Sequence, residues 1–120
     1  FDKINENFIR CSFFELCSRY LSSYYTFAIE QNNSAGRSDF EMTGIPGTDY
    51  YKDDRLAEFK YFKAKEAERM LALSDPRPED VAQVLAYAKD TKVKFPHYHV
   101  RSYIVYICAN KGWKCWEVTP

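Results

Sequence analysis

Apolar and polar residues alternate with a period of two in several stretches of the chain, which is the pattern of half-buried β-strands. The clearest case is Tyr25, Phe27 and Ile29, whose neighbours are smaller or more polar. The same alternation, or an enrichment in β-branched and aromatic residues, predicts five strands. They cover residues 25–30, 39–43, 56–61, 98–108 and 113–118. A short turn containing Asn110 and Gly112 separates the last two, so we expect a terminal hairpin.

Three other stretches repeat their apolar residues at helical spacing. In the first, Ile9 and Phe13 stand one turn apart on the apolar face of an amphipathic helix. The three expected helices cover residues 5–21, 63–73 and 79–90. Pro76 and Pro78 are expected to end the second helix, and Phe95-Pro96 ends the connection that follows the third. The predicted order is therefore helix, three strands, two helices and two strands, which is an α/β fold with a central mixed β-sheet flanked by helices.

The length and composition of the chain are typical of one domain. It has 120 residues, of which 46% are hydrophobic, enough to fill a single core. We interpret residues 1–120 as one domain and, because Phe1 rather than Met begins it, as a segment of a longer protein. No stretch has the run of about 18 apolar residues that a membrane span requires, and no leader pattern is present. We expect a soluble, cytoplasmic protein.

The formal net charge is zero, which argues against a protein that coats nucleic acid through a strong basic field. The charge is nevertheless uneven along the chain. Residues 1–88 carry 11 Lys and Arg against 15 Asp and Glu, a balance of −4, whereas residues 89–120 carry 6 against 2, a balance of +4. Phosphate groups could bind to this C-terminal third, although a solvated basic surface is an equally good interpretation.

Acidic and basic residues on two of the predicted strands form the strongest chemical pattern. Glu58 and Lys60 are two residues apart on one strand, so both project from the same face of the sheet. Ala57 and Phe59 point the other way, toward the expected core. Asp39 lies on the preceding strand, and antiparallel pairing across a long loop would bring it beside Glu58. The sequence therefore predicts one polar site with two carboxylates and an ammonium group.

The chemistry of these groups suits phosphodiester hydrolysis. Mg²⁺ prefers hard oxygen ligands and keeps several waters, so Asp39 and Glu58 are candidate ligands for Mg²⁺ or Mn²⁺. Lys60 can orient the nucleophile or stabilise the charge that builds on the phosphate. Gln83 and Tyr87, one helical turn apart, can hold the water, the phosphate or Lys60 from a neighbouring helix. An isolated Glu-x-Lys pair is also common as a solvent-facing ion pair, so the interpretation depends on the whole set.

The order of these residues resembles that of the PD-(D/E)XK nuclease superfamily. The matching segments are Glu30, Gly36-Arg37-Ser38-Asp39, Leu56-Ala57-Glu58-Phe59-Lys60 and Gln83-Val84-Leu85-Ala86-Tyr87. The likeness is greatest to the branch found at the C-terminus of prokaryotic AAA-ATPase-like proteins. Two features depart from the pattern: Ser38 stands where the family name has a proline, and the connection between Asp39 and Glu58 is long.

The resemblance implies a restriction-endonuclease-like fold and a Mg²⁺-dependent endonuclease that acts on DNA, with an ATPase module elsewhere in the parent chain. The candidate site comprises Asp39, Glu58, Lys60 and Gln83 as catalytic residues, with Glu30, Tyr87 and Arg37 in supporting positions. Glu30 would be an outer or second metal ligand, and Arg37 would contact phosphate or lie on the surface. Two alternatives remain: a catalytically silent nuclease-fold module that binds nucleic acid or protein, and a purely structural domain.

Other residues with possible chemistry have simpler interpretations. The four cysteines match no metal-binding spacing and are interpreted as free thiols, although Cys108 and Cys115 flank the hairpin turn and a disulfide between them is an alternative. His97 and His99 have the spacing of two ligands on one strand face, but no third ligand is near, so we expect surface residues. Trp113 and Trp116, with Tyr103 and Tyr106, could stack on bases, but aromatic residues of a hairpin more often fill the core, which is the interpretation we favour.

Overall fold

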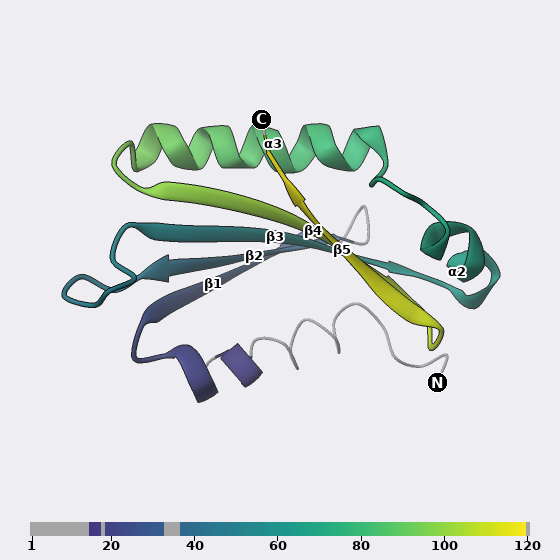
Figure 1. Cartoon of the computed structure of the whole chain (residues 1–120), viewed down its shortest axis with the longest axis horizontal. Helices are drawn as coiled ribbons and strands as arrows, with labels where there is room; N and C mark the ends of the chain where they lie inside the picture. The colour runs from purple at the N-terminus through teal and green to yellow at the C-terminus, as the bar shows by residue number, and fades with distance from the viewer. Residues whose placement is uncertain (1–14, 18, 33–36, 120) are drawn as a thin grey trace.

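The computed structural model describes residues 15–17, 19–32 and 37–119, with side chains for residues 15–17, 19–28 and 40–119. A five-stranded sheet forms its centre, and the strands lie side by side in the order β1-β2-β3-β4-β5 (Figure 1). The elements are β1 (Tyr25–Asn32), β2 (Arg37–Gly44), β3 (Asp53–Phe62), α2 (Ala64–Leu71), α3 (Pro78–Lys94), β4 (His99–Cys108) and β5 (Gly112–Val118). This mixed sheet with helices confirms the predicted α/β fold.

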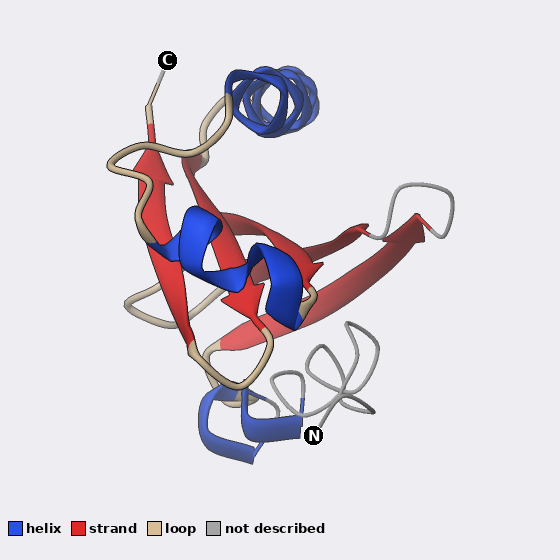
Figure 2. Ribbon diagram, turned by 90° about the vertical axis from the view of Figure 1, so that its right-hand side faces the viewer, coloured by secondary structure: helices blue, strands red, loops and turns tan. Residues whose placement is uncertain are grey.

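The helices α2 and α3 form the connection between two parallel strands. β3 and β4 pair in parallel, whereas β1–β2, β2–β3 and β4–β5 are antiparallel. Parallel neighbours require a long crossover, which here carries both helices across one side of the sheet (Figure 2). Of the helix expected at 5–21, residues 15–17 and 19–21 are helical, and the remainder lies outside the described residues. None of the described helices has the length and apolarity needed to cross a membrane.

The helix α3 begins one residue earlier than the sequence analysis predicts, at Pro78, and extends four residues farther at its C-terminal end. It continues through Thr91-Lys92-Val93-Lys94 and ends at Phe95. The prediction stopped too early because this last turn has no apolar periodicity of its own. Lys92 and Lys94 nevertheless favour it, since cations near a helix C-terminus interact well with the helix dipole. Pro96 supplies the stop, because the residue before a proline is disfavoured in the helical conformation.

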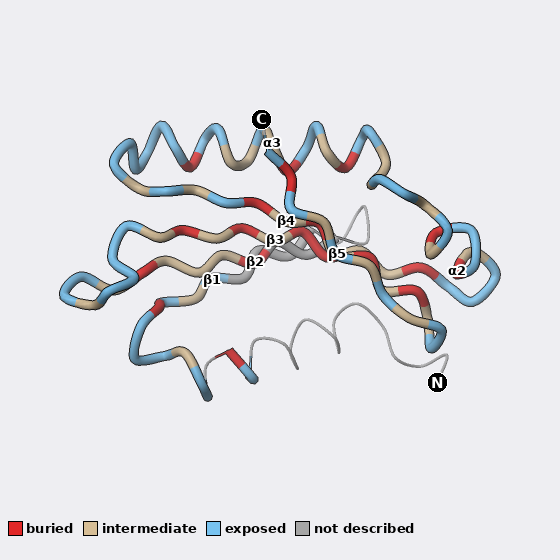
Figure 3. Tube along the Cα trace, viewed as in Figure 1, coloured by how far each residue is buried: buried red, intermediate tan, exposed pale blue. Residues whose placement is uncertain are grey.

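Both faces of the sheet are apolar, which corrects the expectation that the face of Glu58 is chemical and only the other is core. The larger core lies on the Glu58 face, under α2 and α3 (Figure 3). Its buried members are Phe62, Ala67, Met70, Val84, Ile104, Tyr106, Cys108 and Val118. A smaller cluster of Cys17, Phe40 and Phe59 lies on the opposite face. The candidate site is therefore inside a packed layer rather than on an open surface.

The structure of the β4–β5 hairpin shows the environment of its cysteines and its aromatic residues. Cys108 is buried and Cys115 is exposed, and both are free thiols, as the sequence analysis favoured. They belong to opposite faces, because Cys115 pairs with Val105 and Cys108 pairs with Gly112. Of the aromatic residues expected in the core, Tyr106 is fully buried and Trp116 packs against the larger core, as predicted. The prediction is wrong for Trp113, which is 67% exposed. It lies on the face that α2 and α3 leave uncovered.

Gly44 is required where β2 meets the following loop. A methyl group at this position would overlap the backbone carbonyl oxygen of Tyr50. Backbone atoms cannot move aside as a flexible side chain can, so we expect Gly44→Ala to lower the free energy of unfolding by about 3 kcal/mol. Gly47→Ala is the matched control, since its surroundings are open and only its φ of 90° is unfavourable, at about 1 kcal/mol. Urea unfolding measures both, and equal losses would contradict the steric argument.

Candidate active site

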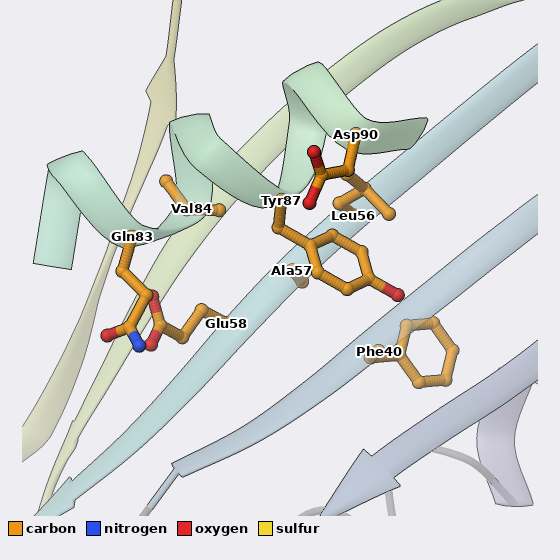
Figure 4. A pocket seen from close by; sticks show the side chains of 8 residues that line it. All are labelled: Phe40, Leu56, Ala57, Glu58, Gln83, Val84, Tyr87 and Asp90. Atoms are coloured by element: carbon orange, nitrogen blue, oxygen red, sulfur yellow. The ribbon is translucent and has the colours of Figure 1, made fainter. Parts of the chain in front are cut away.

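Glu58 lies near the middle of β3 and is only 3% exposed. Strand alternation places its side chain on the face covered by α3, on the same side as Leu56 and Lys60. It borders a cavity of about 200 Å³ between the sheet and the helix (Figure 4). The cavity is lined by Phe40, Leu56, Ala57, Glu58, Gln83, Val84, Tyr87 and Asp90. A buried carboxylate beside an open volume of this size is the central feature of the site.

The helix α3 contributes two of the predicted residues to this cavity. Gln83 and Tyr87 are four residues apart on α3 and both line the cavity with Glu58. The amide of Gln83 points toward the carboxylate of Glu58 (Figure 4). The hydroxyl of Tyr87 lies 3.5 Å from Oε1 of Glu41 on β2, to which it donates a long hydrogen bond. The structure therefore brings Glu58, Gln83 and Tyr87 together.

The backbone register relates the three other predicted residues to Glu58. Asp39 is the direct cross-strand partner of Glu58, so the long loop does not prevent these two positions from meeting. Glu30 is the partner of Asp39 on β1, and Arg37 is the partner of Lys60. The side chains of Glu30, Arg37 and Asp39 lie outside the described residues, as does Gly36. Positions 30, 39 and 58 form one row across β1, β2 and β3, and positions 37 and 60 belong to a separate row two residues along β3.

Lys60 has a specific partner that the sequence analysis does not identify. Its Nζ lies 3.6 Å from Oδ1 of Asp80, and its side chain is 20% exposed. Lys60 is not among the residues that line the cavity. Among the described side chains, the ammonium group is thus directed to the N-terminal end of α3 rather than to Gln83 or Tyr87.

Asp80 connects several groups beneath the first turn of α3. Its carboxylate is 4% exposed and accepts a hydrogen bond from the hydroxyl of Tyr106, while Nε of Arg77 donates to Oδ2 at 3.0 Å. Burial, reinforced by this hydrogen bond, raises the pKa of Tyr106 to about 12. The sequence contains a usable signal for Asp80, since it stands three residues before Gln83 and hence on nearly the same helix face. No sequence pattern predicts the contact between Asp80 and Lys60.

A second acidic pair lies on the same sheet face, farther along β3. Asp54 is completely buried, and neither of its carboxyl oxygens accepts a hydrogen bond from the described residues. Burial, then the hydrogen bond to Glu41 and the charges of Glu41 and Asp53, raises the pKa of Asp54 to about 8. Two ionised carboxylates cannot donate to one another, so the contact between Asp54 and Glu41 is favourable when Asp54 holds a proton.

The remaining candidate groups do not form a second site. His97 and His99 are exposed, and no group of three or more His, Cys, Asp or Glu side chains that could hold a metal occurs among the side chains described. Much of the C-terminal basic excess contacts the chain itself. Arg101 makes a bidentate ion pair with Glu117, and Nζ of Lys111 lies 3.4 Å from Oε1 of Glu68. The prediction that phosphate binds this region remains untested.

A comparison with protein families supports the family resemblance that the sequence pattern indicates. A family model described as the PD-(D/E)XK nuclease superfamily matches residues 4–117 of the chain. Neither a curated protein nor a solved structure gives a significant match. The matched range contains all the described strands and helices except the last residue of β5, together with every residue of the candidate site.

Proposed function

Because the chain belongs to the PD-(D/E)XK nuclease superfamily, we propose that it is a divalent-metal-dependent nuclease domain that hydrolyses phosphodiester bonds in DNA. The buried carboxylate of Glu58 on the α3 cavity, with Asp39 directly across the β2–β3 pair, is the observation that carries the proposal. Residues opposite each other in an antiparallel pair share a face of the sheet. Positions 39 and 58 can therefore serve a single site.

The donor chemistry of these positions suits Mg²⁺ or Mn²⁺. Asp39 and Glu58 would hold the ion, since hard divalent cations prefer carboxylate oxygens and retain waters in the remaining positions. Glu30, the cross-strand partner of Asp39, would be an outer ligand or a ligand of a second ion. When bound, such an ion makes a coordinated water more acidic and offsets negative charge at the phosphate.

The side chains around the ion would orient the reacting groups. Lys60 would place its positive charge where negative charge builds on the phosphate. Gln83 faces Glu58 and can hold either that carboxylate or the attacking water by hydrogen bonds (Figure 4). Tyr87 would fix the far end of the cavity, and Arg37, the partner of Lys60 in the register, would contact a neighbouring phosphate. These roles follow from position and chemical type.

One observation favours a second candidate function. Lys60 is engaged with Asp80, and a lysine that is not directed into the cavity is compatible with a nuclease-fold module that binds nucleic acid or protein without cutting it. Association with an ATPase module in a longer parent chain, membership of the AAA-ATPase-associated branch and a cytoplasmic location are also proposals. The first two rest on the sequence resemblance alone.

Metal-dependent cleavage of supercoiled plasmid DNA tests the leading function. We expect the purified chain to nick or linearise the plasmid with Mg²⁺ or Mn²⁺, and we expect excess EDTA to stop the reaction. Lys60→Ala should slow it by about 100-fold, because a charge-stabilising donor is lost. Lys63→Ala is the matched control, since it removes an exposed lysine three residues away. Absence of cleavage with both metals, together with retained DNA binding, would contradict the nuclease proposal and favour the silent module.

A further inference from the structure

We infer that Asp80 is a positioning residue that fixes the ammonium group of Lys60, an inference that rests on the proposed function. The two side chains come from different elements, β3 and the first turn of α3, and meet with Nζ and Oδ1 3.6 Å apart. The contact is largely shielded from water, because Asp80 is 4% and Lys60 20% exposed. Salt screening and solvent competition, which weaken surface ion pairs, are reduced at such a location.

The carboxylate of Asp80 is held independently of Lys60. Its other oxygen, Oδ2, accepts hydrogen bonds from Nε of Arg77 and from the hydroxyl of Tyr106. Tyr106 is a fully buried residue of β4, the strand next to Lys60, and pairs directly with Lys60 in the sheet. Asp80 is thus attached to both the helix and the sheet, so its free oxygen occupies a defined position beside the Lys60 ammonium.

Arg77 completes this anchor from the residue that precedes α3. Its guanidinium carbon lies 5.1 Å from the ring centre of Phe62, and its backbone N–H donates to the Tyr106 hydroxyl at 3.1 Å. A carboxylate in the first turn of a helix also interacts favourably with the helix dipole. These contacts hold the Asp80 side chain in one position. A surface carboxylate without such contacts would move together with Lys60.

The fixed position of Asp80 limits the conformations that the Lys60 side chain can adopt. A lysine has a flexible four-carbon stem, and an untethered ammonium group would sample many positions around the cavity edge. The fixed Asp80 carboxylate restricts the ammonium group to the α3 side of the sheet, the face that Lys60 shares with Glu58 by strand alternation. A misplacement of about 1 Å in a reacting group can cost about 100-fold in rate, so this restriction should contribute to turnover rather than to binding of DNA.

The substitution Asp80→Asn tests the inference, because it keeps the shape of the side chain and removes its charge. We expect kcat for plasmid cleavage to fall by about 10- to 100-fold while KM for DNA stays within about twofold. Asp80→Glu should restore part of the loss. Glu79→Gln is the matched control, since it removes an adjacent carboxylate that also contacts Arg77 but is 67% exposed. An unchanged kcat in the Asp80→Asn variant would overturn the inference.

Labelling of Lys60 with an amine-reactive reagent, followed by peptide mass spectrometry, gives a readout that does not depend on cleavage. Lys63 is the exposed internal reference. We expect Lys60 to react several-fold more slowly than Lys63 in the wild type and to approach it in Asp80→Asn. If Asp80→Asn does not fold, Tyr106→Phe tests the same anchor and should speed labelling more moderately. Equal Lys60 labelling in wild type and variant would overturn the inference.

The two readouts separate the inference from the proposed function. If the wild-type chain cuts no DNA, the nuclease proposal fails, and labelling alone decides whether Asp80 fixes Lys60. If the wild type cuts DNA and Asp80→Asn loses kcat with faster labelling of Lys60, both proposals are supported. If the loss appears in KM instead, Asp80 acts on DNA binding and is not a positioning residue for Lys60.

Discussion

Glu58→Gln will reduce metal-dependent DNA cleavage by about 1000-fold or more, the largest loss expected for any single substitution in this chain. An amide has nearly the same shape as a carboxylate but carries no charge, and it is a poor ligand for a hard divalent cation. Isothermal titration with Mn²⁺ should show the loss of a binding site in parallel with the loss of cleavage. Binding of DNA without metal should change little.

The same substitution should leave the fold intact. Gln occupies the volume of Glu58, and the surrounding core of α3 and β4 is unaltered, so the urea midpoint should remain close to that of the wild type. Glu68→Gln is the control, since it removes an equal charge from an 87% exposed side chain on α2. Metal-dependent cleavage by Glu58→Gln at the rate of Glu68→Gln would show that Glu58 is not a metal ligand.

The order of elements and the shared face of Glu58 and Lys60 could be predicted, because both depend on local periodicity. The alternation in β3 places residues 56, 58, 60 and 62 on one face whatever the neighbouring strands do. The coverage of that face could not be predicted from β3 alone. Its apolar members, Leu56 and Phe62, signal burial, but residues of equal hydrophobicity occupy the other face, so both remain plausible cores until the crossover direction is known.

In the candidate site too, the relations set by local spacing could be predicted, and those set by long-range packing could not. Gln83 and Tyr87 share a helix face by their spacing, and this local relation survives in the folded chain as two residues of one cavity. The partner of Lys60 is determined by how α3 packs on β4. The sequence around Lys60 gives no sign that Asp80, 20 residues later, is this partner. Long-range contacts of this kind depend on packing angles, which a single sequence does not encode in any short pattern.

Asp54 shows how neighbouring residues decide which of two adjacent carboxylates is buried. The strand expected at residues 56–61 in fact begins at Asp53, so both Asp53 and Asp54 belong to β3. Within a strand, one of two adjacent carboxylates must face inward. Asp53 accepts hydrogen bonds from Tyr25 and Arg55 at the partly exposed side, which leaves Asp54 beneath the sheet face next to Glu41.

The buried Asp54 should make the stability of the protein depend strongly on pH. In the unfolded chain this carboxyl titrates near its ordinary value of about 3.9, whereas burial and Glu41 raise the pKa in the folded state to about 8. Between these values the folded state retains a proton that the unfolded state has released. The contribution of Asp54 is therefore fully present below about pH 4 and decreases as pH rises toward 8, by up to about 1.4 kcal/mol per pH unit.

Replacement of Asp54 by Asn should remove this dependence, because the amide keeps a donor for Glu41 without a titrating proton. Urea unfolding at pH 5, 6, 7 and 8 should show a growing advantage of Asp54→Asn over the wild type as pH increases. Asp49→Asn, an exposed loop carboxylate, is the control and should parallel the wild type. Glu41→Gln should flatten the wild-type curve, since it removes the charge that most opposes ionisation of Asp54. Parallel curves for wild type and Asp54→Asn from pH 5 to 8 would mean that Asp54 is ionised in the folded protein, with a cation or solvent at the Glu41–Asp54 pair.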